Sequence, residues 1–241
     1  TPVISSAASD VYKRQDPGYV MDDADLGAAV ATLVDAAMYN SGQCCCGMER
    51  IYVHESQYDE FVERAVATIS NYRLGNPLDA DTTMGPMAHL RFADTVRRQT
   101  AAAVTAGATA HIATMDADDG GAYLTPQLLT GVTHDMEVMR EESFGPVVGV
   151  MKVSGDDEAV ALMNDSRYGL TASLWTPDVE RAARVGDRVE TGTVFLNRAD
   201  YLDPGLCWTG VKDTGRGGGL SVIGYHNLTR PKSYHLKKVT S

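Results

Sequence analysis

The side chains with the greatest chemical potential lie together in N-S-G-Q-C-C-C (40–46), which holds three of the chain's four cysteines. A cysteine is a nucleophile in its thiolate form, which helix N-termini, cations or backbone N–H groups favour. Gly42 introduces a turn after an expected helix, and such a turn can direct one thiol into a cleft while its neighbours point elsewhere. Backbone N–H groups at the turn could also stabilise an oxyanion on an attacked carbonyl. The stretch is therefore a candidate nucleophile site.

Two other interpretations of the three cysteines stand beside this one. Free cysteine is among the most buried residue types, and on spacing alone an inert structural role is favoured for each thiol. A zinc site is disfavoured, because consecutive cysteines do not match the usual two-residue gap between ligands and no histidine lies nearby. No metal is therefore expected.

The second candidate motif is R-E-E-S-F-G-P (140–146), which directly precedes the apolar run V-V-G-V-M-K-V (147–153). A carboxylate pair at a Gly-Pro turn before a strand can place one acid and one aromatic ring at a sheet edge, where α/β proteins bind ligands. Glu142 could accept hydrogen bonds from sugar hydroxyls, and Phe144 could pack on a planar ring. The alternative is a solvated acidic loop.

Hydrophobic periodicity predicts the elements that would position these motifs. Helices of 9 to 20 residues alternate with short apolar strands, which indicates an α/β layered domain with a mostly parallel sheet. The expected helices cover 22–40, 58–72, 87–106, 156–164 and 179–189, and the expected strands cover 50–53, 108–112, 147–153, 172–176 and 193–197.

Composition excludes several classes of function. The net charge of −11 argues against a surface that binds nucleic acid. The sequence has no run of about 18 apolar residues, so a membrane-spanning helix is not expected. Adjacent cysteines are unsuited to a disulfide scaffold, which favours a reducing, cytoplasmic location.

Taken together, the two motifs are similar to those of the aldehyde dehydrogenase superfamily. The resemblance extends from Asp16 to the C-terminus. It is carried by N-S-G-Q-C-C-C (40–46), I-Y-V-H-E-S-Q-Y-D-E-F-V-E-R (51–64), L-G-N-P-L-D (74–79), G-P-M (85–87), E-E-S-F-G-P-V (141–147), Y-G-L-T-A-S-L-W-T (168–176), F-L-N (195–197) and G-V-K-D-T-G-R-G (210–217). It implies a three-layer catalytic domain with a C-terminal oligomerisation arm.

The resemblance also implies roles for individual residues. The nucleophile is the second residue after G-Q, which is Cys45. Glu142 matches the family's contact to the nicotinamide ribose, and Phe144 matches its ring contact. Asn197 closes the F-x-N strand beside the active site. The implied cofactor is NAD or NADP.

Substrate-lining residues follow from the loop before G-V-K, which borders the aldehyde tunnel in the family. The candidates are Leu202, Cys207 and Trp208. The family usually has Pro-Phe-Gly-Gly where this chain has Cys207-Trp208-Thr209-Gly210. This departure alters the tunnel wall, so a preference for a particular aldehyde cannot be carried over.

The implied reaction is oxidation of an aldehyde to a carboxylic acid. The Cys45 thiolate attacks the aldehyde carbon, backbone N–H and an Asn amide hold the oxyanion, hydride leaves to the nicotinamide, and a Glu-activated water hydrolyses the thioester. In the family this Glu lies in E-L-G-G, where the chain has D-V-Y-K-R-Q (10–15), and no Glu precedes Glu49. The chain is therefore expected to be a C-terminal catalytic half, inactive alone, and steady NADH formation by it would contradict this.

The expected organisation has three parts. Residues 1–15 form a leader unlike the family, disordered or artefactual; residues 16–225 form the catalytic domain; and residues 226–241 form the arm. The alternating stretch Pro231–Val239 is expected to add a strand to a partner in a homodimer or tetramer. Two alternatives remain: a CoA-acylating dehydrogenase, and a non-catalytic remnant that acts as a binding or assembly module.

Overall fold

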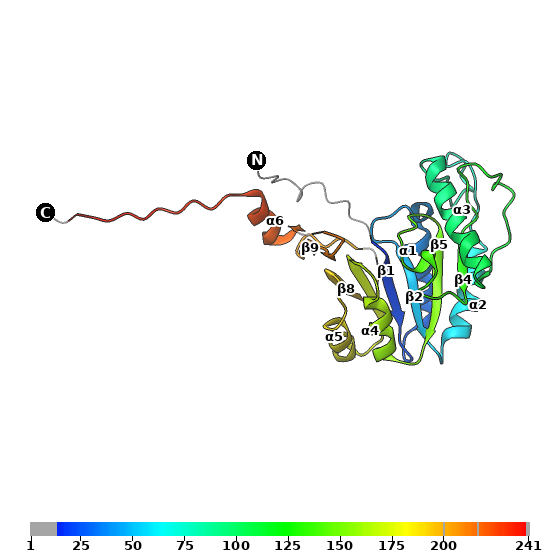
Figure 1. Cartoon of the computed structure of the whole chain (residues 1–241), viewed down its shortest axis with the longest axis horizontal. Helices are drawn as coiled ribbons and strands as arrows, with labels where there is room; N and C mark the ends of the chain where they lie inside the picture. Colours follow the sequence, from blue (N-terminus) through cyan, green and yellow to red (C-terminus); the bar gives the residue numbers. More distant parts are fainter. Residues whose placement is uncertain (1–13, 200, 216, 240–241) are drawn as a thin grey trace.

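A seven-stranded sheet forms the centre of the molecule. The computed structural model describes residues 14–199, 201–215 and 217–239. The strands lie in the order β3-β4-β5-β2-β1-β7-β8, and all neighbours are parallel except β3 and β4. Their bounds are β1 Asp16–Val20, β2 Met48–His54, β3 Thr109–Ala110, β4 Gln127–Thr130, β5 Val147–Val153, β7 Thr171–Trp175 and β8 Thr193–Leu196 (Figure 1). The expected α/β fold with a mostly parallel sheet is confirmed.

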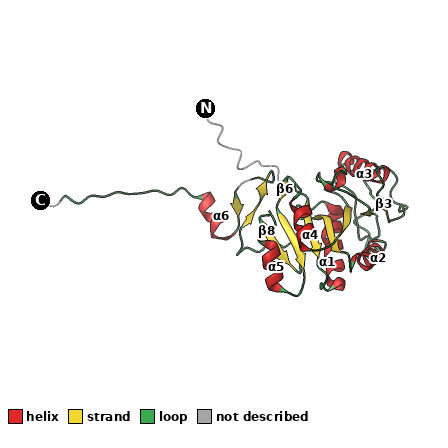
Figure 2. Ribbon diagram, turned by 60° about the horizontal axis from the view of Figure 1, so that its bottom comes forward, coloured by secondary structure: helices red, strands yellow, loops and turns green. Residues whose placement is uncertain are grey.

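Helices pack on both faces of this sheet, because successive strand residues point to opposite sides. Along β2, Ile51 and Val53 join an apolar cluster with α1 and α2, whereas Tyr52 joins a second cluster with α3, α4 and α5. The helices are α1 Leu26–Met38, α2 Tyr58–Ile69, α3 Leu90–Thr105, α4 Asp156–Asn164 and α5 Val179–Gly186 (Figure 2). The central strands are therefore buried on both sides.

Helices α2, α4 and α5 begin at the expected residues, whereas α1 and α3 begin later because capping residues set their starts. Asp25 accepts a hydrogen bond from the Ala28 N–H at 3.1 Å, so α1 begins at Leu26 and not at residue 22. His89 caps α3 through Nδ1, which accepts from the Arg91 N–H at 3.1 Å. Asp and other side-chain acceptors satisfy N–H groups that have no partner in the first turn.

Strand β1 was missed by the sequence patterns, although it lies near the middle of the sheet. Its sequence, D-P-G-Y-V, contains Pro17 and Gly18, which usually mark strand edges or breaks. The strand instead pairs with β2 on one side and β7 on the other. Gly18 fits because a Cβ there would lie 2.9 Å from Leu33 of α1. Close packing of α1 on β1 therefore overrides the local pattern.

The structure shows where the predicted boundaries of the leader and of the C-terminal arm fall. Residues 1–13 lie outside the described residues, whereas Gln15, assigned to the leader, is buried in the domain: its amide donates to Val138 O at 2.8 Å, and its carbonyl accepts from Arg50. The boundary expected after residue 225 falls inside helix α6, Ser221–Leu228. Residues 230–239 are exposed and have no regular secondary structure in the described chain (Figure 1).

Short elements complete the described chain. They are 3-10 turns η2 Tyr39–Gly42 and η3 Glu137–Met139, and the two-residue strands β6 Tyr168–Gly169, β9 Trp208–Thr209, β10 Val211–Lys212 and β11 Gly218–Gly219. Strand β10 pairs with β6, and β11 pairs with β9, both antiparallel. Among the described residues, every helix is too short or too polar to cross a bilayer.

Candidate active site

The cysteines follow a tightly constrained turn between α1 and β2. Asn40, Ser41 and Gly42 all have left-handed backbone angles, with φ of 51°, 57° and 70°. A left-handed conformation costs a residue with a Cβ roughly 1–2 kcal/mol, so the surroundings must hold it in place. Ser41 Oγ donates to Gly85 O at 2.7 Å, and Asn40 Nδ2 donates to Gln43 O at 3.1 Å. The side chains of Asn40 and Ser41 therefore hold the turn in its left-handed conformation.

Gln43 ties this turn to a third segment. Its Oε1 accepts from the Ala88 N–H at 2.8 Å, and its Nε2 donates to Asn40 O at 3.1 Å. The turn then closes with a hydrogen bond from the Gly47 N–H to Cys44 O at 3.2 Å. The backbone that carries the three thiols is therefore fixed on both sides.

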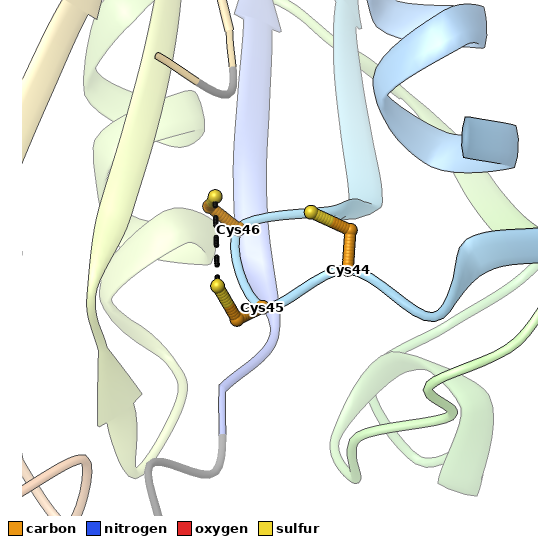
Figure 3. A group of neighbouring side chains, drawn as sticks. All are labelled: Cys44, Cys45 and Cys46. Atoms are coloured by element: carbon orange, nitrogen blue, oxygen red, sulfur yellow. Dashed lines mark hydrogen bonds between the residues drawn. The ribbon is translucent and has the colours of Figure 1, made fainter. Parts of the chain in front are cut away.

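This geometry gives the three thiols different environments. Cys45 is exposed, Cys44 is half-buried, and Cys46 is buried with 2% of its surface accessible. The three side chains project from a single bend, and the sulfurs of Cys45 and Cys46 lie 4.0 Å apart (Figure 3). Cys45 is the thiol best placed to meet a solute.

The electrostatics of the turn also favour Cys45. Hydrogen bonds from the Cys44 and then the Cys46 side chain lower the pKa of Cys45 well below that of an ordinary thiol. The positive charge of Arg14 acts in the same direction, and partial burial opposes it. A thiolate that is both exposed and stabilised is the form that reacts with carbon electrophiles.

A cavity of about 430 Å³ opens in front of the cysteines. It is lined by the last turns of α1, by all three cysteines and by the segment after β8, which contributes Ala199 and Leu202. Its volume falls within the range typical of small-molecule pockets. The structure therefore brings Leu202, a predicted substrate-lining residue, to the same cavity as Cys45.

The second motif forms a loop fixed by a buried acid of β2. Glu49 accepts hydrogen bonds from the N–H groups of Ser143, at 2.9 Å, and Phe144, at 2.9 Å. Phe144 has a φ of 50°, so these bonds hold an unfavourable backbone conformation. The Phe144 ring is 36% exposed, and the half-buried Glu142 carboxylate accepts from the Arg14 N–H at 3.1 Å.

The cysteine turn and the Glu142–Phe144 loop are in contact at Gly42 and Gly145. A Cβ on Gly42 would lie 2.1 Å from Gly145 O and 2.7 Å from Pro146 N, so the backbones are in direct contact. The cysteine turn precedes β2 and the Glu142–Phe144 loop precedes β5, and these strands are parallel neighbours. Both motifs therefore lie at the amino ends of the strands, opposite the carboxyl ends where open α/β sheets usually bind ligands.

Asn197 does not line the cysteine cavity. It follows the carboxyl end of β8, and its amide group is engaged with the backbone of Thr176: Oδ1 accepts from the N–H at 3.1 Å and Nδ2 donates to the carbonyl at 2.9 Å. It lines a different cavity, with residues that follow β1 and β7. The structure places it as a link between the ends of β7 and β8.

Cys207 and Trp208 also lie outside the lining of the cysteine cavity. Trp208 belongs to β9, which pairs with β11, and the sulfur of Cys207 packs against Gly218. Both side chains are half-buried. In this chain they belong to the segment that leads to α6, so their contact with a substrate remains a prediction.

Glu49 was missed by the sequence patterns. The only hint was a charged pair, Glu49-Arg50, at the start of an otherwise apolar strand. Arg50 is 1% exposed, and its guanidinium donates to the carbonyls of Gln15 and Met163. Buried charged groups require such partners, which a strand pattern does not reveal.

Burial makes the stability of the chain depend on pH through two acids. Burial raises the pKa of Glu49 to about 8 and that of Asp16 to about 7. Because both folded-state values exceed the unfolded ones, their stabilising contribution is complete below about pH 4 and is lost as the pH rises through 7 and 8. We expect the free energy of unfolding in urea to fall by roughly a few kcal/mol between about pH 5 and about pH 9.

Glu49→Gln should reduce this decline and leave only the share due to Asp16, because glutamine mimics the neutral carboxyl group of Glu49. Glu63→Gln, which changes an exposed carboxylate on α2, is the matched control and should keep the full pH dependence. If Glu49→Gln and Glu63→Gln show the same dependence as the unaltered chain, Glu49 is ionised in the fold and this account of the loop is wrong.

Comparison with known proteins matches this geometry to a family. Residues 15–234 match the model of the "Aldehyde dehydrogenase family". The chain is 38% identical over 217 residues to "Succinate-semialdehyde dehydrogenase [NADP(+)]" of Deinococcus radiodurans, an alignment that covers 90% of this chain and 46% of that protein. The chain thus spans about half the length of the relatives it matches.

Solved structures match the fold of this chain as well. A structure of Gox0499, described as giving insights into cofactor and substrate selection, superposes with a TM-score of 0.88 at 40% identity and covers 92% of this chain and 49% of that one. Betaine aldehyde dehydrogenase of Staphylococcus aureus in complex with NAD+ has a TM-score of 0.83 at 31% identity, over 88% of this chain and 43% of that chain.

Proposed function

The chain belongs to the aldehyde dehydrogenase family, and we propose that it supplies the nucleophile and part of the cofactor contact for NAD(P)-dependent oxidation of an aldehyde to an acid. The observation that carries the proposal is the position of Cys45: an exposed thiol with a lowered pKa, on a constrained turn, facing a cavity of about 430 Å³. Its neighbours Cys44 and Cys46 support the thiolate as hydrogen-bond donors.

The chemistry assigned to Cys45 is attack on the aldehyde carbon. The thiolate sulfur forms a bond to carbon, and the carbonyl electron pair moves to oxygen to give a thiohemiacetal. After loss of hydride the group on sulfur is a thioester, and addition of water releases the acid and returns the thiolate. Leu202 lines the same cavity, which supports the proposal that it contacts the apolar part of a substrate.

The residues at the second motif fit a dinucleotide in two respects. The Glu142 carboxylate accepts hydrogen bonds, as ribose hydroxyls require, and the exposed Phe144 ring offers a flat apolar surface. The cofactor supplies the hydride acceptor when it is bound. Relatives with NADP(+) and with NAD+ in their names both occur, so either dinucleotide remains open for this chain.

Assembly into a homo-oligomer is part of the proposal. The exposed segment 231–239 carries alternating side chains outside regular secondary structure, which suits addition to the sheet of a second copy. The proposed domain division keeps 16–225 as the catalytic unit, with α6 spanning its end.

The proposal is tested by acylation, which requires only the nucleophile. We expect p-nitrophenyl acetate to release p-nitrophenolate and leave one acetyl group, located on Cys45 by peptide mass spectrometry. A short aldehyde should slow this acylation by occupying Cys45. Release of the acetyl group to water supports the acid-forming reaction, whereas transfer to added CoA supports the acylating alternative. Acetylation spread equally over all four cysteines would favour a non-catalytic assembly module.

A further inference from the structure

The three sulfurs of Cys44, Cys45 and Cys46 form a compact cluster. All three lie within 4.8 Å of one another. A metal site was not expected from the sequence, because consecutive cysteines do not match the usual two-residue gap between zinc ligands and no histidine lies nearby. The bend closed by the Gly47 N–H and Cys44 O nevertheless brings the three sulfurs close together (Figure 3).

The spacing of the sulfurs suits a thiophilic cation. A zinc–sulfur bond of about 2.3 Å places sulfurs about 3.8 Å apart around a tetrahedral ion and about 4.0 Å apart around a trigonal one. The sulfurs of Cys45 and Cys46 lie 4.0 Å apart, and the remaining separations stay within 4.8 Å.

Access to the thiols and the softness of sulfur both favour a thiophilic cation as the ligand. Cys45 is exposed and Cys44 is half-buried, so an ion can enter from the cavity. Asp35 of α1 lines that cavity and adds negative charge on the approach, whereas the positive charge of Arg14 near Cys45 opposes a cation and must be outweighed by the metal–sulfur bonds. Thiolates select soft or borderline ions such as Zn²⁺, whereas Mg²⁺ and Ca²⁺ prefer oxygen ligands.

We propose that Cys44, Cys45 and Cys46 form a binding site for a divalent d¹⁰ cation of the Zn²⁺ and Cd²⁺ class, with a fourth coordination position open to the cavity. As each metal–sulfur bond forms, the thiol releases its proton to solvent, so three protons balance three bonds when all ligands start as thiols. Bound metal holds the Cys45 sulfur, so it excludes electrophiles from that atom. Metal binding itself does not depend on the proposed aldehyde chemistry.

The test is a titration of the reduced 241-residue chain with Cd²⁺, read by the cadmium–thiolate charge-transfer absorption. We expect saturation at one ion per chain, with Zn²⁺ competing and Mg²⁺ not. Cys44→Ser and Cys46→Ser should each weaken binding by at least about tenfold. Cys207→Ser is the matched control, because Cys207 is not part of the three-sulfur cluster, and it should bind normally.

Two results would overturn the site. One is absence of the charge-transfer band from the folded chain; the other is equal Cd²⁺ affinity in Cys44→Ser, Cys207→Ser and the unaltered chain. Cys46 is buried, so the fold of Cys46→Ser is checked by circular dichroism, and the half-buried Cys44 provides the deciding variant if that protein unfolds. Loss of Cd²⁺ binding with retained acylation of Cys45 would separate this inference from the proposed function.

Discussion

Gly42→Ala is expected to destabilise the chain by about 3 kcal/mol or more, which corresponds to a fall in melting temperature of roughly 6–12 °C for a domain of this size. The added Cβ would lie 2.1 Å from Gly145 O and 2.2 Å from Gly145 C. Both atoms belong to backbone, so neither can rotate away. The φ of 70° adds a further cost of about 1–2 kcal/mol for any residue with a Cβ.

The same substitution should disturb the site, because the contact joins the cysteine turn to the Glu142–Phe144 loop. We expect Gly42→Ala, where it folds, to lose the selective acylation of Cys45. The measurement is thermal unfolding by circular dichroism, followed by the acylation assay below the melting temperature.

Gly131→Ala is the matched control for this prediction. Gly131 has a similar φ of 67°, but the nearest atom to an added Cβ lies at 3.5 Å, an ordinary contact. Only the backbone cost remains, so the loss should be about 1–2 kcal/mol. Equal losses for Gly42→Ala and Gly131→Ala would show that contact between the two motifs contributes nothing to stability.

Cys45→Ala is expected to reduce the rate of p-nitrophenyl acetate cleavage by at least about 10²-fold, to the level of uncatalysed hydrolysis. The cause is loss of the single exposed, stabilised thiolate in the cavity. Stopped-flow absorbance of p-nitrophenolate measures the effect.

Cys207→Ala supplies the comparison, since it removes a half-buried thiol that does not line the cysteine cavity. It should retain the acylation rate within a factor of about two if only Cys45 reacts. A Cys45→Ala protein that is acylated as fast as the unaltered chain would refute the assignment of the nucleophile.

Much of the fold could be predicted from periodicity, and the failures have physical causes. Helix α4 and strand β5 were expected at their observed bounds, because an acidic first turn and an apolar run are local patterns. Strand β1 was missed, since Pro17 lies where the pairing with β2 shifts register and Gly18 is required by close packing against Leu33 of α1. Tertiary contacts of this kind leave no periodic pattern.

The residues of the candidate site likewise include some that motifs predicted and others that they did not. Cys45, Glu142 and Phe144 were predicted from motifs, and the structure brings their two segments into contact at Gly42 and Gly145. Glu49 was not predicted, because its role depends on two N–H groups almost a hundred residues away. The proximity of the three sulfurs was not predicted either, since it arises from the bend closed by the Gly47 N–H and Cys44 O, which residue spacing cannot reveal.

The most direct test of the central claim is the rate of iodoacetamide alkylation at each cysteine, measured by quenched time points and peptide mass spectrometry at several pH values. A lowered pKa and free access predict that Cys45 reacts at least about tenfold faster than Cys44, Cys46 or Cys207 at neutral pH, and that its rate persists into mildly acidic solution. Equal rates at all four cysteines, or a Cys45 rate that rises only near the pKa of a free thiol, about 8.5, would contradict the claim that Cys45 is the nucleophile.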